Sequence, residues 1–209
     1  EIESLWSGKK HIVWNLDRQV NILSGVNGVG KSTILNKLIA PLKFPNKGEI
    51  PHGNGVKIET VPEDATHIRF DVIRSIDRPL INAEIASQLD FKVATELDLQ
   101  IYTLQRRYLD YQVNIANRMI EALQNGNAPE AQRLSAVKTK FQDMIDRLFA
   151  ETGKTIIRTA NEIRFLQIGE ELTPYQLSSG EKQMLVILLT VLVEDNKPYL
   201  LLMDEPEIG

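Results

Sequence analysis

Hydrophobic positions follow two periods along the chain, one typical of strands and one typical of helices. Short apolar runs bounded by turn residues predict strands at 11–14, 20–24, 56–61, 67–73, 163–168 and 199–203. From about Glu96 the period changes, and apolar residues recur every three or four positions on both sides of the breaker at 124–129. This order of short strands around a helical block predicts an α/β sheet that is interrupted in sequence by a helical lobe.

The helical block carries one apolar stripe on each side of its breaker. The first stripe consists of Leu97, Ile101, Leu104, Tyr108, Tyr111, Ile115, Met119 and Ala122. The second consists of Ala131, Leu134, Val137, Phe141, Met144 and Leu148. Two core helices packed on each other as a hairpin are favoured over a protruding coiled-coil arm, which remains the alternative.

A glycine-rich segment, Gly25-Val26-Asn27-Gly28-Val29-Gly30-Lys31-Ser32, lies between the apolar run 20–24 and a helix predicted to end at Pro41. This is the phosphate-binding loop pattern in its required strand-to-helix context, although an ordinary glycine turn is the alternative. Glycines let backbone N–H groups converge on a polyphosphate at the positive end of a helix. Lys31 would reach the β- and γ-phosphates, and the Ser32 hydroxyl would bind Mg²⁺. The predicted nucleotide-binding residues of this segment are Asn27, Gly28, Val29, Gly30, Lys31, Ser32 and Thr33.

The apolar strand predicted at 199–203 ends in two acids, Asp204 and Glu205. Acids at the carboxyl edge of a buried strand lie where open α/β sheets bind ligands. Asp204 is the candidate second metal ligand beside Ser32. Glu205 is the candidate catalytic group that orients or deprotonates the attacking water. Lys31 is the other predicted catalytic residue. A solvated acidic turn is the alternative.

The segment 177–183 opens the longest apolar run, Met184 to Val193, which is about half the length that a bilayer span requires. Ser178 and Glu181 have the spacing of a capping box, so a purely structural helix start is one interpretation. A helix start with free N–H groups and serine hydroxyls is also an anion site.

Segments 25–32, 177–183 and 199–205, in this order with a helical lobe between the first two, resemble the Walker A, signature and Walker B motifs of ABC-type ATPases. Within that superfamily, residues 178–183 and 204–209 resemble the SMC-like, RecF-like and OLD-like heads with AAA-type ATP-binding domains more than transporters. Transporters usually carry glycine in place of Ser179, and a different segment after the Walker B acids.

The resemblance implies an α/β P-loop NTPase of ABC-ATPase type, with a mixed sheet and an inserted helical subdomain. The expected divisions are 1–91 for the first part of the core, 92–160 for the helical lobe and 161–209 for the signature and Walker B part. The resemblance also implies a head-to-head homodimer that binds ATP and Mg²⁺. In this dimer the segment Ser178, Ser179 and Gly180 would face the γ-phosphate held by the partner, and a monomer would hydrolyse slowly at best.

Other family features have weaker candidates. Gln88 is the candidate for the Q-loop, with a helix-surface glutamine as the favoured alternative. Trp6 or Trp14 could stack on adenine, although a core or rim position is favoured. The histidine switch is expected after Gly209. Because the sequence begins without Met and stops directly after a predicted buried strand, we expect it to be a fragment. No structural metal is assigned, since the three histidines lack metal-site spacing: His11, His52 and His67.

Composition agrees with an ordinary globular protein: 43% hydrophobic residues, 25% charged residues and a net charge of -4 over 209 residues. The chain has no cysteine, which excludes disulfides and thiolate sites and fits the reducing cytoplasm. We expect no membrane partner, because the longest apolar run is about half the length of a bilayer span. The relatives named above suggest DNA repair or maintenance, or defence against phage and plasmids, beside a nuclease or effector partner. Arg106-Arg107, Lys138 and Lys140 are basic points for DNA contact, but solvated helix faces are favoured. A nucleotide-dependent assembly module with little turnover and a transporter nucleotide-binding subunit are the rival functions.

Overall fold

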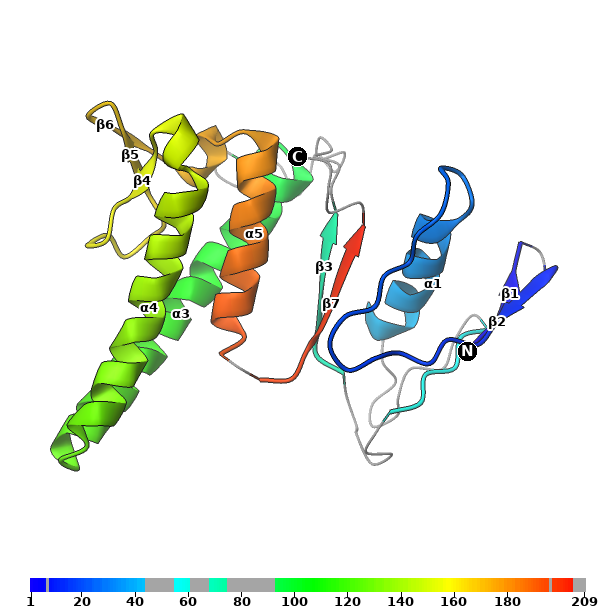
Figure 1. The fold of residues 1–209 in the computed structure, drawn as a ribbon, viewed down its shortest axis with the longest axis horizontal. Helices are drawn as coiled ribbons and strands as arrows, with labels where there is room; N and C mark the ends of the chain where they lie inside the picture. The colour runs from blue at the N-terminus through cyan, green and yellow to red at the C-terminus, as the bar shows by residue number, and fades with distance from the viewer. Residues whose placement is uncertain (7, 44–54, 61–67, 75–92, 196, 205–209) are drawn as a thin grey trace. The chain divides into compact units, whose positions relative to one another are not determined.

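The computed structural model describes the whole chain except residues 7, 44–54, 61–67, 75–92, 196 and 205–209 (Figure 1). Two compact units divide it. The first contains Glu1–Val72 and Pro198–Asp204, and the second contains Ile73–Lys197. The chain therefore leaves the first unit, builds the second, and returns to the first. The boundaries expected from the sequence, after residues 91 and 160, stay predictions.

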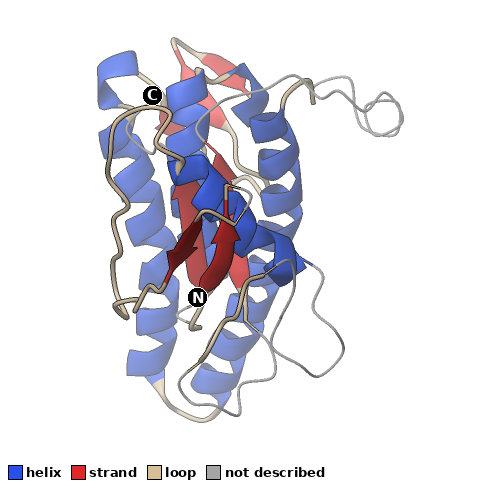
Figure 2. Cartoon of the chain, turned by 90° about the vertical axis from the view of Figure 1, so that its right-hand side faces the viewer, coloured by secondary structure: helices blue, strands red, loops and turns tan. Residues whose placement is uncertain are grey.

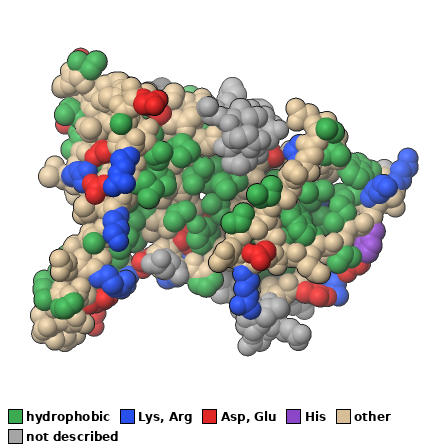
Figure 3. Space-filling model, viewed as in Figure 1, with side chains coloured by type: hydrophobic (Ala, Val, Ile, Leu, Met, Phe, Trp, Pro, Cys, Tyr) green, Lys and Arg blue, Asp and Glu red, His purple; other side chains and the backbone are tan. Residues whose placement is uncertain are grey.

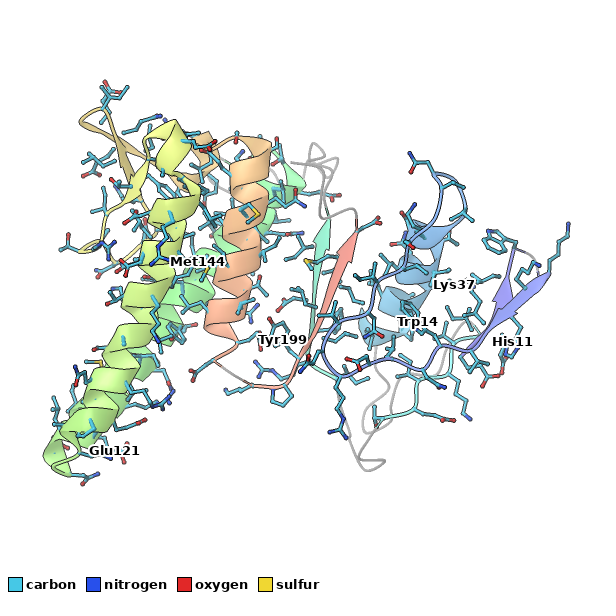
Figure 4. The ribbon with its side chains drawn as sticks, viewed as in Figure 1. His11, Trp14, Lys37, Glu121, Met144 and Tyr199 are labelled. Atoms are coloured by element: carbon cyan, nitrogen blue, oxygen red, sulfur yellow. The ribbon has the colours of Figure 1, made fainter. Side chains whose placement is uncertain are left out.

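The first unit begins with an antiparallel hairpin of β1 (Ile2–Leu5) and β2 (Lys10–Ile12). Ile2 pairs with Ile12 across the hairpin and also forms an isolated bridge with Val56. Ile2, Leu5, Ile34 and Val56 form a buried cluster, against which Trp14 and Leu23 pack. Figure 4 shows Trp14 beside the first helix. This hairpin places Trp6, at its turn, close to the glycine-rich segment.

Helix α1 (Lys31–Lys43) and a two-stranded sheet follow the hairpin among the described elements. The sheet pairs β3 (Phe70–Arg74) with β7 (Leu200–Asp204), and the two arrows point the same way in Figure 1. Ile39 and Leu42 of α1 are buried with Leu202 of β7. The start of α1 and the end of β7 are thereby brought to the same place.

Within its described residues, the second unit contains three helices and a small sheet. Figure 2 colours the helices of the whole chain blue and its strands red. The helices are α3 (Glu96–Gln124), α4 (Ala128–Leu148) and α5 (Ser179–Val193). The antiparallel sheet contains β4 (Thr155–Ile156), β5 (Phe165–Gln167) and β6 (Glu170–Leu172). Two short 3-10 turns, η1 (Ala150–Thr152) and η2 (Pro174–Gln176), precede β4 and α5. Helices α3 and α4 follow each other along the chain and pack together, and α3 also packs against α5.

The buried stripe of α4 differs from the predicted one near its end. Met144 and Leu148 are 48% and 44% exposed, whereas Ile145 and the following Phe149 are buried; Figure 4 labels Met144 on α4. The Phe149 ring lies 5.5 Å from that of Phe165, centroid to centroid. The larger aromatic side chain therefore takes the inward position, and the stripe is shifted by one residue.

Several strand predictions are wrong in whole or in part. The prediction 11–14 runs two residues past β2, which ends at Ile12, and the prediction 67–73 begins before β3, which begins at Phe70. Residues 20–24 form no strand, and Val20 and Ile22 are 70% and 83% exposed. Val56 makes only its bridge to Ile2, and residues 57–60 add no strand to it. The predicted strand 163–168 is reduced to β5 (Phe165–Gln167), because Ile168 turns into the next strand with a positive φ of 51°. An apolar run becomes a strand only where a neighbour accepts its hydrogen bonds.

Helix α1 passes through Pro41, where the sequence predicted its end. Proline lacks only its own N–H bond, a small loss in the last turn of a helix. Within the part of the chain that the structure describes, no helix is both long and apolar enough to cross a lipid bilayer.

Candidate functional site

The glycine-rich segment forms a tight loop that ends at the first turn of α1. Val29 donates its N–H to the Val26 carbonyl at 3.3 Å, and Gly28 has a φ of +82°. Gly30 has a φ of +101°, and a Cβ there would lie 2.5 Å from Cζ2 of Trp6. Both positions favour glycine, the first for its backbone angle and the second also for the close approach of the indole ring.

The helix that follows this loop is suited to an anion. Its first turn contains Lys31, Ser32 and Thr33 and no acidic residue, so nothing in that turn opposes the positive end of the helix dipole. The first N–H groups of any helix lack acceptors within the helix and can donate to a ligand. The sequence therefore folds locally into the arrangement that binds phosphate groups elsewhere.

Lys31 spans the loop with its side chain. Its ammonium group donates to the Gly25 carbonyl at 2.7 Å and lies 3.4 Å from the Val26 carbonyl oxygen. A lysine ammonium held across this loop, beside the positive end of α1, is a point charge that could bind a polyanion. The residues predicted around it, from Asn27 to Thr33, lie in this one loop and helix start.

Ser32 and Asp204 meet although 172 residues separate them in the sequence. The Ser32 hydroxyl donates to Oδ1 of Asp204 at 3.1 Å, at a part-buried position. Packing of Leu202 against Ile39 and Leu42 fixes β7 beside α1 and so brings the two groups together. A hydroxyl and a carboxylate oxygen are ligands that Mg²⁺ accepts beside nucleotide phosphates. The two groups therefore fit the magnesium ion that the sequence predicted there.

Of the two tryptophans, Trp6 is the one beside the loop. Its ring lies against Gly30 and the side chain is 45% exposed, whereas Trp14 packs on the apolar cluster of the first unit. Trp14 packs at the core and Trp6 lies at the rim, the two kinds of position that the sequence favoured over stacking on adenine. Only Trp6 is available to a ligand of the loop.

The predicted anion site in the second unit is the start of α5. Ser178 caps the helix, accepting at Oγ from the Glu181 N–H at 3.3 Å, while Oε2 of Glu181 accepts from the Ser178 N–H at 2.9 Å. The capping box predicted from the sequence is confirmed. Ser179 and Gly180 form the first turn of the helix with Glu181.

Charged neighbours that sequence reasoning missed surround this helix start. Lys154 and Thr152 both donate to Oε1 of Glu181 at 2.8 Å. Lys182 pairs with Asp98 at 2.8 Å, and both side chains are almost fully buried. Lys154 and Thr152 are isolated polar residues that give no signal in a hydrophobic pattern, so only the tertiary structure identifies them.

Burial raises the pKa of Glu181, but the bonds from Lys154, the Ser178 N–H and Thr152 outweigh it and lower the pKa to about 2. Stabilisation by this carboxylate is therefore fully present above its unfolded value of 4.5 and is lost only as the pH falls towards 2. The cap stays ionised at neutral pH.

Several predicted residues lie outside the described part of the chain. They are the catalytic candidate Glu205, the Q-loop candidate Gln88, His52 and His67. His11 is described, and its Nε2 lies 2.9 Å from a carboxylate oxygen of Glu1 at an exposed position. The roles of these residues stay predictions.

Comparison with protein families gives one match. The family model described as ABC transporter matches residues 14–207, which include the loop, the start of α5 and Asp204. No curated protein and no solved structure matches the chain. ABC-type domains bind ATP, usually with Mg²⁺, typically act as ATPases and commonly dimerise. Because the match covers nearly all of the sequence, the chain belongs to the ABC-type family of P-loop ATPases.

Proposed function

We propose that the chain is an ATPase head that binds Mg-ATP, pairs head to head with a second copy and hydrolyses the nucleotide at the interface. The contact between Ser32 and Asp204 carries this proposal, because it joins the phosphate loop to the end of β7 at 3.1 Å. Phosphoryl transfer needs mainly positioning and charge stabilisation, and this loop offers both. Ser178, Ser179 and Gly180 would complete the site of the partner copy.

The start of α5 supports pairing between two copies. Its serine hydroxyls and N–H groups would form a second anion site on the same chain, in a different compact unit from the phosphate loop. If a second copy supplies this site, turnover depends on the meeting of two chains. A regulatory module with little turnover would bind ATP without this dependence.

Phosphate release measured over a range of protein concentrations tests the proposal. We expect the rate to rise with the square of concentration and then to saturate per chain, because dimerisation limits turnover at low concentration. A specific rate that stays constant from the most dilute sample would contradict a site shared between copies. Absence of phosphate release at every concentration, with ATP bound, would favour the regulatory module.

Trp6 is proposed to stack on the adenine base. We expect ATP to quench tryptophan fluorescence in Trp14→Phe, which keeps Trp6, and not in Trp6→Phe, which keeps Trp14. Trp6→Ala should weaken ATP binding about tenfold, since stacking of a base on an aromatic ring contributes roughly 1–3 kcal/mol. Quenching that survives in Trp6→Phe would assign the role to Trp14 instead.

A role linked to DNA, in repair, maintenance or defence, rests on the resemblance to SMC-like, RecF-like and OLD-like heads. The hairpin cations add little to it, because Arg107 pairs with Glu194 and Lys138 donates to Gln112 at 2.6 Å. Basic and acidic side chains also lie interleaved over the hairpin on the face shown in Figure 3. Salt-dependent binding to duplex DNA is the measurement that would support contact, with a nuclease or effector as a separate partner.

A transporter subunit is the second candidate, because the matching family model carries that description. Ser179 in a position where transporters usually carry glycine favours the proposal above. Purification with a membrane subunit would reverse this preference.

A further inference from the structure

The Glu181 carboxylate links the start of α5 to Thr152 and Lys154, which precede β4 in the sequence. One oxygen, Oε2, accepts from the Ser178 N–H at 2.9 Å. The other, Oε1, accepts from the Lys154 ammonium and from the Thr152 hydroxyl, each at 2.8 Å. The side chains of Lys154 and Glu181 are each 11% exposed. A capping box needs only Ser178 and Glu181, so the two added donors exceed what a helix start requires.

Lys182, the next residue of α5, forms a buried ion pair with an acid of α3. Lys182 pairs with Oδ1 of Asp98 at 2.8 Å, and the two side chains are 10% and 3% exposed. The other oxygen of Asp98 caps α3, accepting from the N–H groups of Ala94 at 3.0 Å and Thr95 at 3.2 Å. Consecutive residues on a helix point about 100° apart, so two such pairs fix the rotation of α5 about its axis as well as its position.

Buried ion pairs of this kind are poor sources of net stability, because removing two charges from water costs about as much as their attraction returns. Their better-supported use is to fix one geometry among several. Here the fixed element is the short segment Ser178–Gly180, whose hydroxyl and N–H groups must meet a phosphate within a few tenths of an ångström.

We propose that Lys154, assisted by Thr152, is a positioning residue for ATP hydrolysis. It holds Glu181, and through it the Ser178 backbone, so that Ser178–Gly180 present their donors to the γ-phosphate bound by a second copy. The inference rests on the proposed function. It adds residues that belong to no motif in the sequence and that touch no nucleotide themselves.

Lys154→Met, Lys154→Arg and Thr152→Val test the proposal in the full chain, with Lys140→Met as the control at an exposed lysine of α4. For Lys154→Met we expect ATP affinity in dilute, monomeric protein to change by less than about twofold, while kcat at saturating protein falls about 10- to 100-fold, as misplacements near 1 Å do. Lys154→Arg keeps the charge and should recover most of the rate. Thr152→Val should lower kcat by about threefold, and Lys140→Met should leave both constants unchanged.

Three outcomes would overturn the inference. The first is a kcat for Lys154→Met equal to wild type. The second is an equal fall in kcat and in monomer ATP affinity, which indicates general structural damage. The third is an arginine variant as poor as the methionine variant. If Lys154→Met does not fold, an unchanged kcat in Thr152→Val decides against the proposal and a selective fall in kcat supports it. Failure of the proposed function looks different, since the wild-type protein would then release no phosphate or would show a specific rate that does not depend on its concentration.

Discussion

Lys31→Ala is expected to abolish ATP binding, with a loss of affinity of at least about a hundredfold, equivalent to roughly 3 kcal/mol. The ammonium group is held across the loop by the Gly25 carbonyl, at 2.7 Å, where it would meet the polyphosphate tail of the proposed ligand. Charge-assisted bonds to phosphate are about twice as strong as neutral ones, and alanine leaves no donor in their place. Isothermal titration calorimetry with Mg-ATP measures the effect directly.

Lys140→Ala is the matched control, because it removes the same charge from an exposed position on α4 in the other compact unit. Its ATP affinity should equal that of the wild type. Circular dichroism of Lys31→Ala should show the wild-type helix content, since the bonds of the Lys31 side chain end in the exposed loop. Normal ATP binding by Lys31→Ala would remove the basis of the proposed function.

Local signals in the sequence predicted the helices well. The repeat of apolar residues after Glu96 gave α3 and α4, and the spacing of Ser178 and Glu181 gave the start of α5. Caps and stripes are properties of neighbouring residues, so a single sequence contains them. The shift at Phe149 was missed because two inward candidates, Leu148 and Phe149, compete, and packing against Phe165 selects the larger.

Strands and ion pairs were harder to predict because they depend on distant residues. The run 20–24 has strand composition, yet only Leu23 of it packs on the cluster around Ile34. The bond between Lys154 and Glu181 joins positions 27 residues apart, which no periodic pattern records. The meeting of Ser32 and Asp204 was predictable only because both belong to motifs whose chemistry requires a shared metal ion.

The two parts of the candidate site also differ in whether local residues or distant contacts fix their geometry. The loop assembles from consecutive residues and the first turn of α1, so its geometry follows from glycine, lysine and serine in that order. The start of α5 also caps itself, but its orientation depends on Lys154 and Asp98, which come from other elements. Substitutions at these two supports should therefore separate hydrolysis from nucleotide binding.

Glu205→Gln should retain ATP binding while trapping an ATP-bound dimer, with kcat lowered about 100- to 1000-fold. Glu205 directly follows Asp204, and Oδ1 of Asp204 lies 3.1 Å from the Ser32 hydroxyl. A general base contributes roughly 10²–10⁴ in rate, and glutamine keeps its size but cannot take a proton. Single-turnover kinetics and gel filtration with Mg-ATP measure the two parts of this result.

Asp204→Asn is the paired comparison, because it makes the same chemical change one residue earlier. An amide binds Mg²⁺ less well than a carboxylate, so this variant should lose the magnesium dependence of ATP binding and should form little dimer. The two expected results would separate the proposed roles of these consecutive acids, with Asp204 serving the metal ion and Glu205 the water. Unchanged turnover in Glu205→Gln would exclude its catalytic role, and a trapped dimer in Asp204→Asn would reverse the two assignments.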